Sequence, residues 1–148
     1  MEIVVVGCGK VGKTLVEHLA IEGHNVVVID INQKNVEEIV NTYDVMGICG
    51  NGAIHDIQLE AGVNKADLFI SVTSSDEINL ISCLIARKIG AKNLIARVRN
   101  PDYASQISFM RDGLGISLMI NPEKAAADEI ARILRSVSYT HLRAHETE

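Results

Sequence analysis

A six-residue glycine motif near the start of the chain limits the possible folds more than any other feature. It reads Gly7-Cys8-Gly9-Lys10-Val11-Gly12 and directly follows the apolar run Ile3-Val4-Val5-Val6. In this pattern the first glycine permits a sharp exit from a strand, and the second lets the backbone approach a pyrophosphate. The third lets the next helix pack closely on the sheet. The motif therefore predicts a strand, a phosphate-binding turn and a helix whose free N–H groups face an anion. An ordinary structural turn is the alternative.

An acidic residue follows the glycines at the spacing of a dinucleotide-binding fold. Asp30 closes the apolar run 25–29, where a carboxylate can accept both hydroxyls of an adenosine ribose. We therefore expect NAD(H) as the ligand, with ATP or ADP as the other candidates, because all share that ribose. NADP(H) should be disfavoured, since its 2′-phosphate would face Asp30 and no arginine follows in Ile31-Asn32-Gln33.

Apolar runs and helical patterns alternate through short loops along the rest of the chain. We expect strands at 3–6, 25–29, 44–49, 68–73, 94–98 and 116–120, and helices at 11–22, 33–42, 54–61, 76–88, 100–111 and 122–135. This alternation predicts an α/β fold with right-handed parallel β-α-β units. The expected architecture is a doubly wound, parallel six-stranded, Rossmann-like sheet with strand order 3-2-1-4-5-6.

The ligand of such a sheet lies across the carboxyl ends of its strands, at the point where the strand order reverses. The residues that close or follow strands there form the predicted cofactor-binding set: Gly7, Cys8, Gly9, Lys10, Val11, Gly12, Asp30, Ile31, Asn51, Gly52, Thr73, Ser74 and Arg97. No catalytic or metal-binding residue is predicted.

Several of these side chains have a second interpretation. Lys10 leans over the phosphates or is a solvated lysine at a helix start. Thr73 and Ser74 bind the ligand, cap the following helix, or do both. Arg97 neutralises a phosphate or forms an ion pair with one of two carboxylates, Asp76 and Glu77. Those two acids are better explained as favourable charges at a helix N-terminus than as a general acid or metal ligands.

Composition excludes several functional classes. The 148 residues carry a net charge of −5 without a basic patch, which argues against nucleic-acid binding. Aromatic residues are 3% and there is no Trp, so a base-stacking surface is not expected. No apolar run reaches the length of a membrane span, and no signal peptide is recognisable. We therefore expect a cytoplasmic protein that reaches a membrane only through a partner.

Cysteine and histidine positions give no metal site. Cys8, Cys49 and Cys83 lack C-x-x-C spacing, which fits reduced thiols; Cys8 could act as a redox sensor or fill a tight loop. From position 136 the sequence lacks a capped, periodic ending and resembles a non-native tail. His141 and His145 in this tail have no third ligand. We therefore divide the chain into a nucleotide-binding domain, 1–135, and a tail, 136–148.

Several segments together resemble a known family. They are the glycine motif with Asp30, the turn 50–53, the run 72–79, the segment 96–101 and Ile120-Asn121-Pro122-Glu123. This set is similar to the N-terminal nucleotide-binding (RCK or KTN) domain of the Trk potassium-uptake regulatory subunit, TrkA. The resemblance covers residues 1 to about 135. It implies a cytosolic domain that binds NAD(H) or adenine nucleotides and works with a potassium-translocating membrane subunit, whose pore a ring of such domains controls.

Three functions remain open at this stage. The leading one is a ligand-sensing regulatory domain that is not an enzyme. The second is an NAD-dependent oxidoreductase, although the β-α units leave no further domain to bind a substrate. The third is a protein–protein module with a vestigial nucleotide site. An apolar stripe along the last predicted helix (Ala126, Ile130, Ile133, Leu134, Val137) predicts a homodimer or a higher ring.

Overall fold

The computed structural model describes residues 1–119 and residue 135. The described strands form one parallel sheet in the order β3-β2-β1-β4-β5-β6. The strands are β1 (Glu2–Val6), β2 (Asn25–Asp30), β3 (Met46–Cys49), β4 (Leu68–Ser71), β5 (Leu94–Arg97) and β6 (Ile116–Met119). The predicted fold class and strand order are therefore confirmed.

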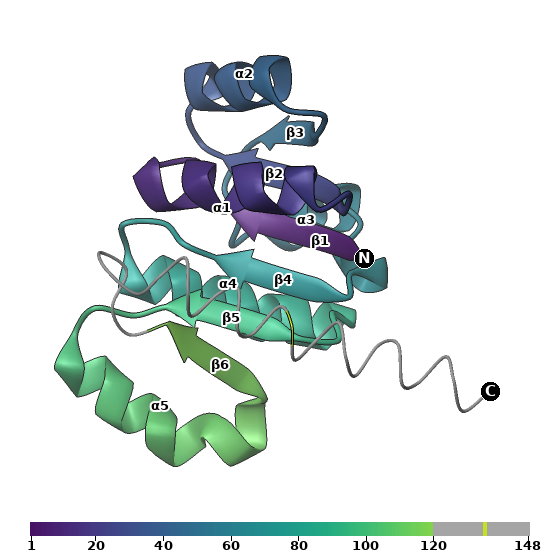
Figure 1. The fold of residues 1–148 in the computed structure, drawn as a ribbon. Helices are drawn as coiled ribbons and strands as arrows, with labels where there is room; N and C mark the ends of the chain where they lie inside the picture. Colours follow the sequence, from purple (N-terminus) through teal and green to yellow (C-terminus); the bar gives the residue numbers. More distant parts are fainter. Residues whose placement is uncertain (120–134, 136–148) are drawn as a thin grey trace.

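Helices connect successive strands and cover both faces of the sheet. They are α1 (Lys10–Ile21), α2 (Gln33–Thr42), α3 (His55–Glu60), α4 (Asp76–Ile89) and α5 (Pro101–Leu114), with a 3-10 turn, η1, at Val63–Lys65. Figure 1 shows α1 in front of β1 and β2, and α4 behind β4 and β5. The predicted last helix lies outside the described residues, and so does the end of the predicted sixth strand, Ile120.

The strands alternate their side chains between two buried clusters, one on each face of the sheet. Ile3 and Val5 of β1 pack in the cluster that includes Leu15 and Leu19 of α1. Val4 and Val6 pack in the other cluster. A strand that is covered on both faces needs apolar residues at every position, which explains the unbroken apolar run of β1. β1 accordingly lies inside the sheet, between β2 and β4.

Two strands are shorter than the sequence pattern predicts, β4 at its end and β3 at its start. The ladder between β1 and β4 ends at the pair Val6↔Ser71, because β1 gives way to the glycine turn there. Val72 and Thr73 are therefore part of the loop after β4, not of the strand. β3 starts at Met46, where pairing with Val27 of β2 begins, two residues later than predicted.

Polar contacts hold the amino edge of the sheet, far along the strands from the glycine turn. The carboxylate of Asp67, just before β4, accepts the backbone N–H of Glu2 at 2.9 Å and the ammonium of Lys92 at 3.3 Å. The side chain of Asn93, just before β5, donates to the backbone carbonyl of Asp67 at 2.9 Å. These bonds fix the starts of β1, β4 and β5 relative to one another.

Candidate functional site

A pocket of about 610 Å³ opens at the carboxyl ends of β1, β2, β4 and β5. It lies where the strand order reverses between β1 and β4. Eleven of the thirteen predicted cofactor-binding residues line it: Gly7, Gly9, Lys10, Val11, Asp30, Ile31, Asn51, Gly52, Thr73, Ser74 and Arg97. The topology therefore brings the predicted set together at one place.

The glycine turn is shaped by close backbone packing. Gly7 has a φ of +107°, and a Cβ there would lie 2.9 Å from the carbonyl carbon of Val72. At Gly12 a Cβ would meet the carbonyl oxygen of Gly7 at 1.8 Å, so α1 approaches the turn closely only because this position lacks a side chain. A Cβ at Gly9 would meet nothing within 4 Å. Gly9 thus leaves open space on the pocket side, which the close approach of the protein backbone to a ligand requires.

Two of the predicted residues, Cys8 and Gly12, do not line the pocket and contribute packing contacts instead. Gly12 packs α1 against Gly7. The side chain of Cys8 is fully buried in the apolar cluster under α1. Burial, reinforced by the nearby Asp30 carboxylate, raises the pKa of the Cys8 thiol to about 12. A buried, protonated thiol is poorly reactive, so the burial of Cys8 favours the loop-filling interpretation over that of a redox sensor.

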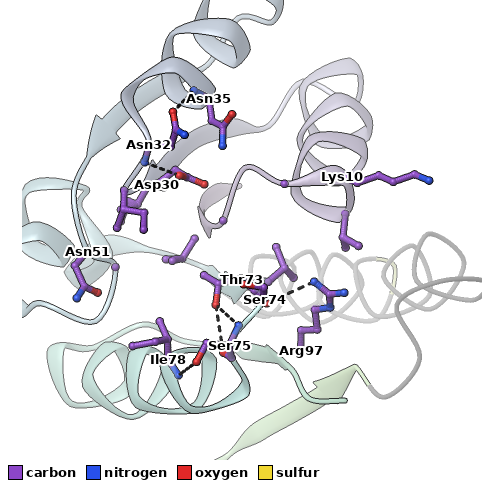
Figure 2. Close-up of a pocket in the computed structure, with 18 of the residues that line it drawn as sticks. Lys10, Asp30, Asn32, Asn35, Asn51, Thr73, Ser74, Ser75, Ile78 and Arg97 are labelled. Atoms are coloured by element: carbon purple, nitrogen blue, oxygen red, sulfur yellow. Dashed lines mark hydrogen bonds between the residues drawn. The ribbon is translucent and has the colours of Figure 1, made fainter. Parts of the chain in front are cut away.

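Asp30 forms one wall of the pocket (Figure 2), and two backbone N–H groups orient its carboxylate. One carboxylate oxygen accepts the N–H of Cys8 at 2.7 Å, and the other accepts the N–H of Asn32 at 2.8 Å. Each oxygen retains lone pairs for a further donor. The carboxylate is thus held between the glycine turn and the start of α2 as an acceptor for two hydroxyl groups.

Asn32 and Asn35 extend this wall, and the sequence pattern did not single them out. Asn32 is the N-cap of α2, and its side-chain oxygen accepts the N–H of Asn35 at 3.2 Å. Both residues line the pocket. The sequence signal for them is the helix-capping Asn32, two residues after Asp30, which puts the first turn of α2 beside Asp30.

The loop after β4 forms the opposite wall. The hydroxyl of Thr73 donates toward the side-chain oxygen of Asn79 at 2.7 Å and accepts the N–H of Ser75 at 3.2 Å. It is therefore bonded within the protein. Ser75 supplies the N-cap of α4, with its hydroxyl accepting the N–H of Ile78 at 3.2 Å. Among the described residues, the hydroxyl of Ser74 has no hydrogen-bond partner, so Ser74 is the better placed of the predicted pair to meet a ligand.

Cationic side chains lie on the same side as this loop. The guanidinium of Arg97 approaches the backbone carbonyl of Thr73 at 3.5 Å. Arg99, which the sequence analysis missed, lines the pocket and donates to the carbonyl of Ser74 at 2.8 Å. It stands two residues after Arg97, a spacing that projects both side chains to one side of an extended chain. Lys10 also lines the pocket, but in Figure 2 its side chain points away from Asp30.

Both acids that the sequence offered as ion-pair partners of Arg97 accept hydrogen bonds from other groups. Asp76 accepts backbone N–H groups of Arg99 and Asn100. Glu77 accepts the hydroxyl of Tyr103 at 2.9 Å. Hydrogen bonds from its own backbone N–H and from Tyr103 lower the pKa of Glu77, while the bond to Glu77 raises the pKa of Tyr103.

The third wall is the turn 50–52 after β3. A Cβ at Gly52 would lie 2.3 Å from a methyl carbon of Val6, so this turn packs directly on the end of β1. The amide of the buried Gln58 donates to the carbonyl of Gly52 at 2.7 Å and to that of Ser82 at 3.0 Å. Gln58 thereby ties the turn to α4, a role that sequence spacing gave no means to predict.

The arrangement has two chemically distinct ends. A carboxylate that can accept hydroxyl groups lies at the end of β2, and two guanidinium groups lie across the pocket beside the loop after β4. Such a polarity suits a ligand with a sugar at one end and phosphate groups at the other. Within the described residues, no cluster of three or more His, Cys, Asp or Glu side chains is placed to hold a metal ion.

Comparison with curated proteins identifies relatives by sequence. The chain is 41% identical over 134 residues to the "Trk system potassium uptake protein TrkA homolog" of Archaeoglobus fulgidus, covering 90% of this chain and 30% of that protein. It is 35% identical over 134 residues to the homologue of Methanothermobacter thermautotrophicus, covering 90% of this chain and 60% of that protein. The chain thus spans less than two thirds of the length of these relatives.

Solved structures share the fold. The TrkA-N domain of the inner membrane protein ybaL from Escherichia coli superposes with a TM-score of 0.72 at 24% identity, covering 92% of this chain and 95% of that one. The GsuK channel bound to NAD gives 0.67 at 20% identity and covers 80% of this chain and 21% of that one. The Shewanella denitrificans Kef C-terminal domain in its AMP-bound form gives 0.67 at 17% identity, covering 98% and 94%.

The family model of the TrkA-N domain matches residues 3–122. This range includes every residue that lines the pocket, from Val6 to Arg99. The sequence-based resemblance is therefore confirmed, and the chain belongs to the TrkA-N domain family.

Proposed function

We propose that this chain is the nucleotide-sensing domain of a potassium-uptake system and that it binds NAD(H) or an adenine nucleotide without turning it over. The observation that carries the proposal is the Asp30 carboxylate, held by two backbone N–H groups at 2.7 and 2.8 Å beside the glycine turn. This acceptor suits the two hydroxyl groups of an adenosine ribose. The curated relatives are named as potassium-uptake proteins, and two structural neighbours are described as bound to NAD and AMP.

The pocket suggests an orientation for the ligand. The ribose lies against Asp30, and the phosphates lie over the glycine turn and the first N–H groups of α1, which attract anions. Arg97 and Arg99 face the phosphates from the other wall. In this orientation the proposed contacts include all thirteen predicted residues except Cys8 and Gly12, whose roles are structural.

The partner in this proposal is a potassium-translocating membrane subunit, which the domain contacts from the cytoplasmic side. Among residues 1–119 and 135, no helix combines the length and the apolar character that crossing a bilayer requires. A ligand regulates such a partner only through different affinities for two arrangements of the assembly. A homodimer or ring formed through the predicted last helix would supply these arrangements; that helix lies outside the described residues.

An oxidoreductase is the weaker alternative. The likeness to the putative short-chain oxidoreductase TTHB094 from Thermus thermophilus, at 14% identity, concerns the fold alone. Hydride transfer to a carbonyl needs a nearby proton donor. Among the described residues that line the pocket there is no His, Tyr or Cys, and the side chain of Lys10 points away from Asp30 in Figure 2. The proposal therefore treats the nucleotide as a signal and not as a co-substrate.

Calorimetric titration tests the proposal directly. The protein should bind NAD, NADH, AMP, ADP or ATP, and should bind NADP more weakly because its 2′-phosphate would face Asp30. Asp30→Ala should weaken NAD binding by about 1–3 kcal/mol, the usual cost of losing hydrogen bonds to a charged acceptor. Glu37→Ala, on the same stretch of chain but absent from the pocket lining, is the matched control. Equal affinity for NAD and NADP would contradict the assignment.

A further inference from the structure

Two polar side chains in the first turn of α4 lie outside the pocket but bond to the segment that carries its arginines. Asp76 is 9% exposed and Asn79 is fully buried. They are three residues apart, so they project from one face of the helix. Neither lines the pocket. In the sequence, Asp76 is explained as a favourable charge at a helix N-terminus, and no pattern gives Asn79 a role.

Asp76 holds the backbone just beyond β5. Its two oxygens both lie 3.1 Å from the backbone nitrogen of Arg99, and one lies 2.8 Å from that of Asn100. Hydrogen bonds to an ionised acceptor are stronger than neutral ones. The carboxylate therefore fixes the path of the chain between β5 and α5, at the residue that carries the second pocket guanidinium.

Asn79 holds the same segment from its other end. Its side-chain nitrogen donates to the carbonyl of Arg97 at 2.9 Å and to that of Thr73 at 3.1 Å. Its side-chain oxygen accepts the backbone N–H of Thr73 at 2.9 Å and the hydroxyl of Ser71 at 3.0 Å. The last paired residues of β4 and β5 are Ser71 and Ala96. The side-chain amide of Asn79 therefore keeps the two chains aligned beyond the end of their backbone pairing.

Asp76 and Asn79 thus bind the backbone after β4 and β5 on the side of α4, while the arginine side chains face the pocket. Arg97 approaches the carbonyl of Thr73, and Arg99 donates to the carbonyl of Ser74. All four residues line the pocket. The ribose-binding wall at Asp30 receives no hydrogen bond from Asp76 or Asn79. Any effect of these two residues should therefore be confined to the phosphate side.

We propose that Asp76 and Asn79 are positioning residues that place Arg97 and Arg99 for the phosphate groups of the ligand. The inference rests on the proposed function, since it assumes that a nucleotide binds in this pocket. It also assigns different parts of the ligand to different walls of the pocket. One wall recognises the sugar, and α4 sets the geometry of the wall that recognises the anion.

The test compares ligands that differ only in their phosphates. NMR titration measures the dissociation constants of adenosine and ADP for the wild type, Asp76→Asn and Asn79→Asp. Both changes conserve side-chain size. Asp76→Asn puts an amide donor against backbone N–H groups, and Asn79→Asp removes both donors to the carbonyls. Glu77→Gln, an exposed carboxylate in the same helical turn, is the matched control.

ADP affinity should fall about ten- to a hundredfold in the two variants, the range expected for lost hydrogen bonds to charged groups, while adenosine affinity stays within about twofold. A role in folding alone would weaken both ligands equally, and that result overturns the inference. An unchanged ratio of ADP to adenosine affinity overturns it as well. Should Asn79→Asp not fold, Asp76→Asn carries the comparison.

Hydrogen exchange in the ligand-free protein separates this inference from the proposed function. The amide protons of Arg99 and Asn100 should exchange slowly in the wild type and in Glu77→Gln, and quickly in Asp76→Asn. Absence of any nucleotide binding by the wild type would refute the proposed function and, with it, the positioning role. Nucleotide binding with unprotected Arg99 and Asn100 amides would refute the positioning role only.

Discussion

Replacing Gly12 with alanine should destabilise the fold, whereas the same change at Gly9 should spare the fold and weaken ligand binding. A Cβ at Gly12 would lie 1.8 Å from the carbonyl oxygen of Gly7, about 1.6 Å short of ordinary contact at 3.4 Å. The contact is with a backbone atom, and a Cβ cannot rotate away from it, so α1 must move away from the turn. A Cβ at Gly9 would meet nothing within 4 Å.

The expected free energies follow from these distances. Forcing atoms into a packed site costs about 1–3 kcal/mol, and a clash with backbone belongs at the upper end. Alanine recovers about 1 kcal/mol of helix propensity over glycine, so Gly12→Ala should lose about 2 kcal/mol of unfolding free energy. Gly9 is the N-cap of α1 with a φ of −73°. There the poorer capping by alanine roughly offsets the reduced entropy of the unfolded chain, so stability should change by less than about 0.5 kcal/mol.

Urea unfolding followed by far-UV circular dichroism measures these changes, since the chain has no Trp. Gly12→Ala should lower the midpoint with an unchanged slope. Titration with NAD supplies the second readout. Gly9→Ala places a methyl group on the pocket side and should weaken binding at wild-type stability. The reasoning fails if Gly12→Ala is as stable as the wild type, or if the two variants lose equal stability.

Further predictions concern thiols, turnover and assembly. At pH 8 a thiol reagent should modify the exposed Cys49 quickly and leave Cys8 and Cys83 unmodified. Burial raises the pKa of both buried thiols, that of Cys8 to about 12. Fast labelling of all three thiols in the folded protein would contradict the described burial. No alcohol, aldehyde or hydroxy acid should change the absorbance at 340 nm with NAD or NADH, and turnover that is lost in Gly9→Val would favour the oxidoreductase instead. Light scattering should give a dimer or larger species that Ile130→Asp with Ile133→Asp disrupts at nearly unchanged nucleotide affinity; a wild-type monomer at high micromolar concentration would refute self-association.

Sequence periodicity was sufficient to predict the alternation of parallel strands and helices. The strand order came from the glycine motif and Asp30, which are typical of a doubly wound dinucleotide-binding sheet. The site was predictable wherever a residue closes a strand, as Asp30 and Arg97 do. Strand ends were less predictable, because a strand ends where its partner ends. Val72 and Thr73 look like a continuation of β4, yet β1 has already turned away at Gly7.

Side-chain direction was the harder part of the prediction. Cys8 belongs to the glycine motif, but its thiol points into the core and only its N–H meets Asp30. The hydroxyl of Thr73 is bonded to Asn79, a contact between residues six apart that depends on how α4 packs on β4 and β5. Such contacts arise only once the helix is placed on the sheet. A pattern in a single sequence therefore does not predict such side-chain contacts.

The polar contacts at the amino edge of the sheet have a consequence for how this domain can change. Asp67, Lys92 and Asn93 fasten the starts of the strands, while the pocket lies at the other end of the same strands. Substitutions that adapt the pocket to a different ligand therefore leave these contacts at the starts of the strands unchanged. A lineage, or a protein engineer, can exchange the signal that such a domain recognises and keep the scaffold that presents it.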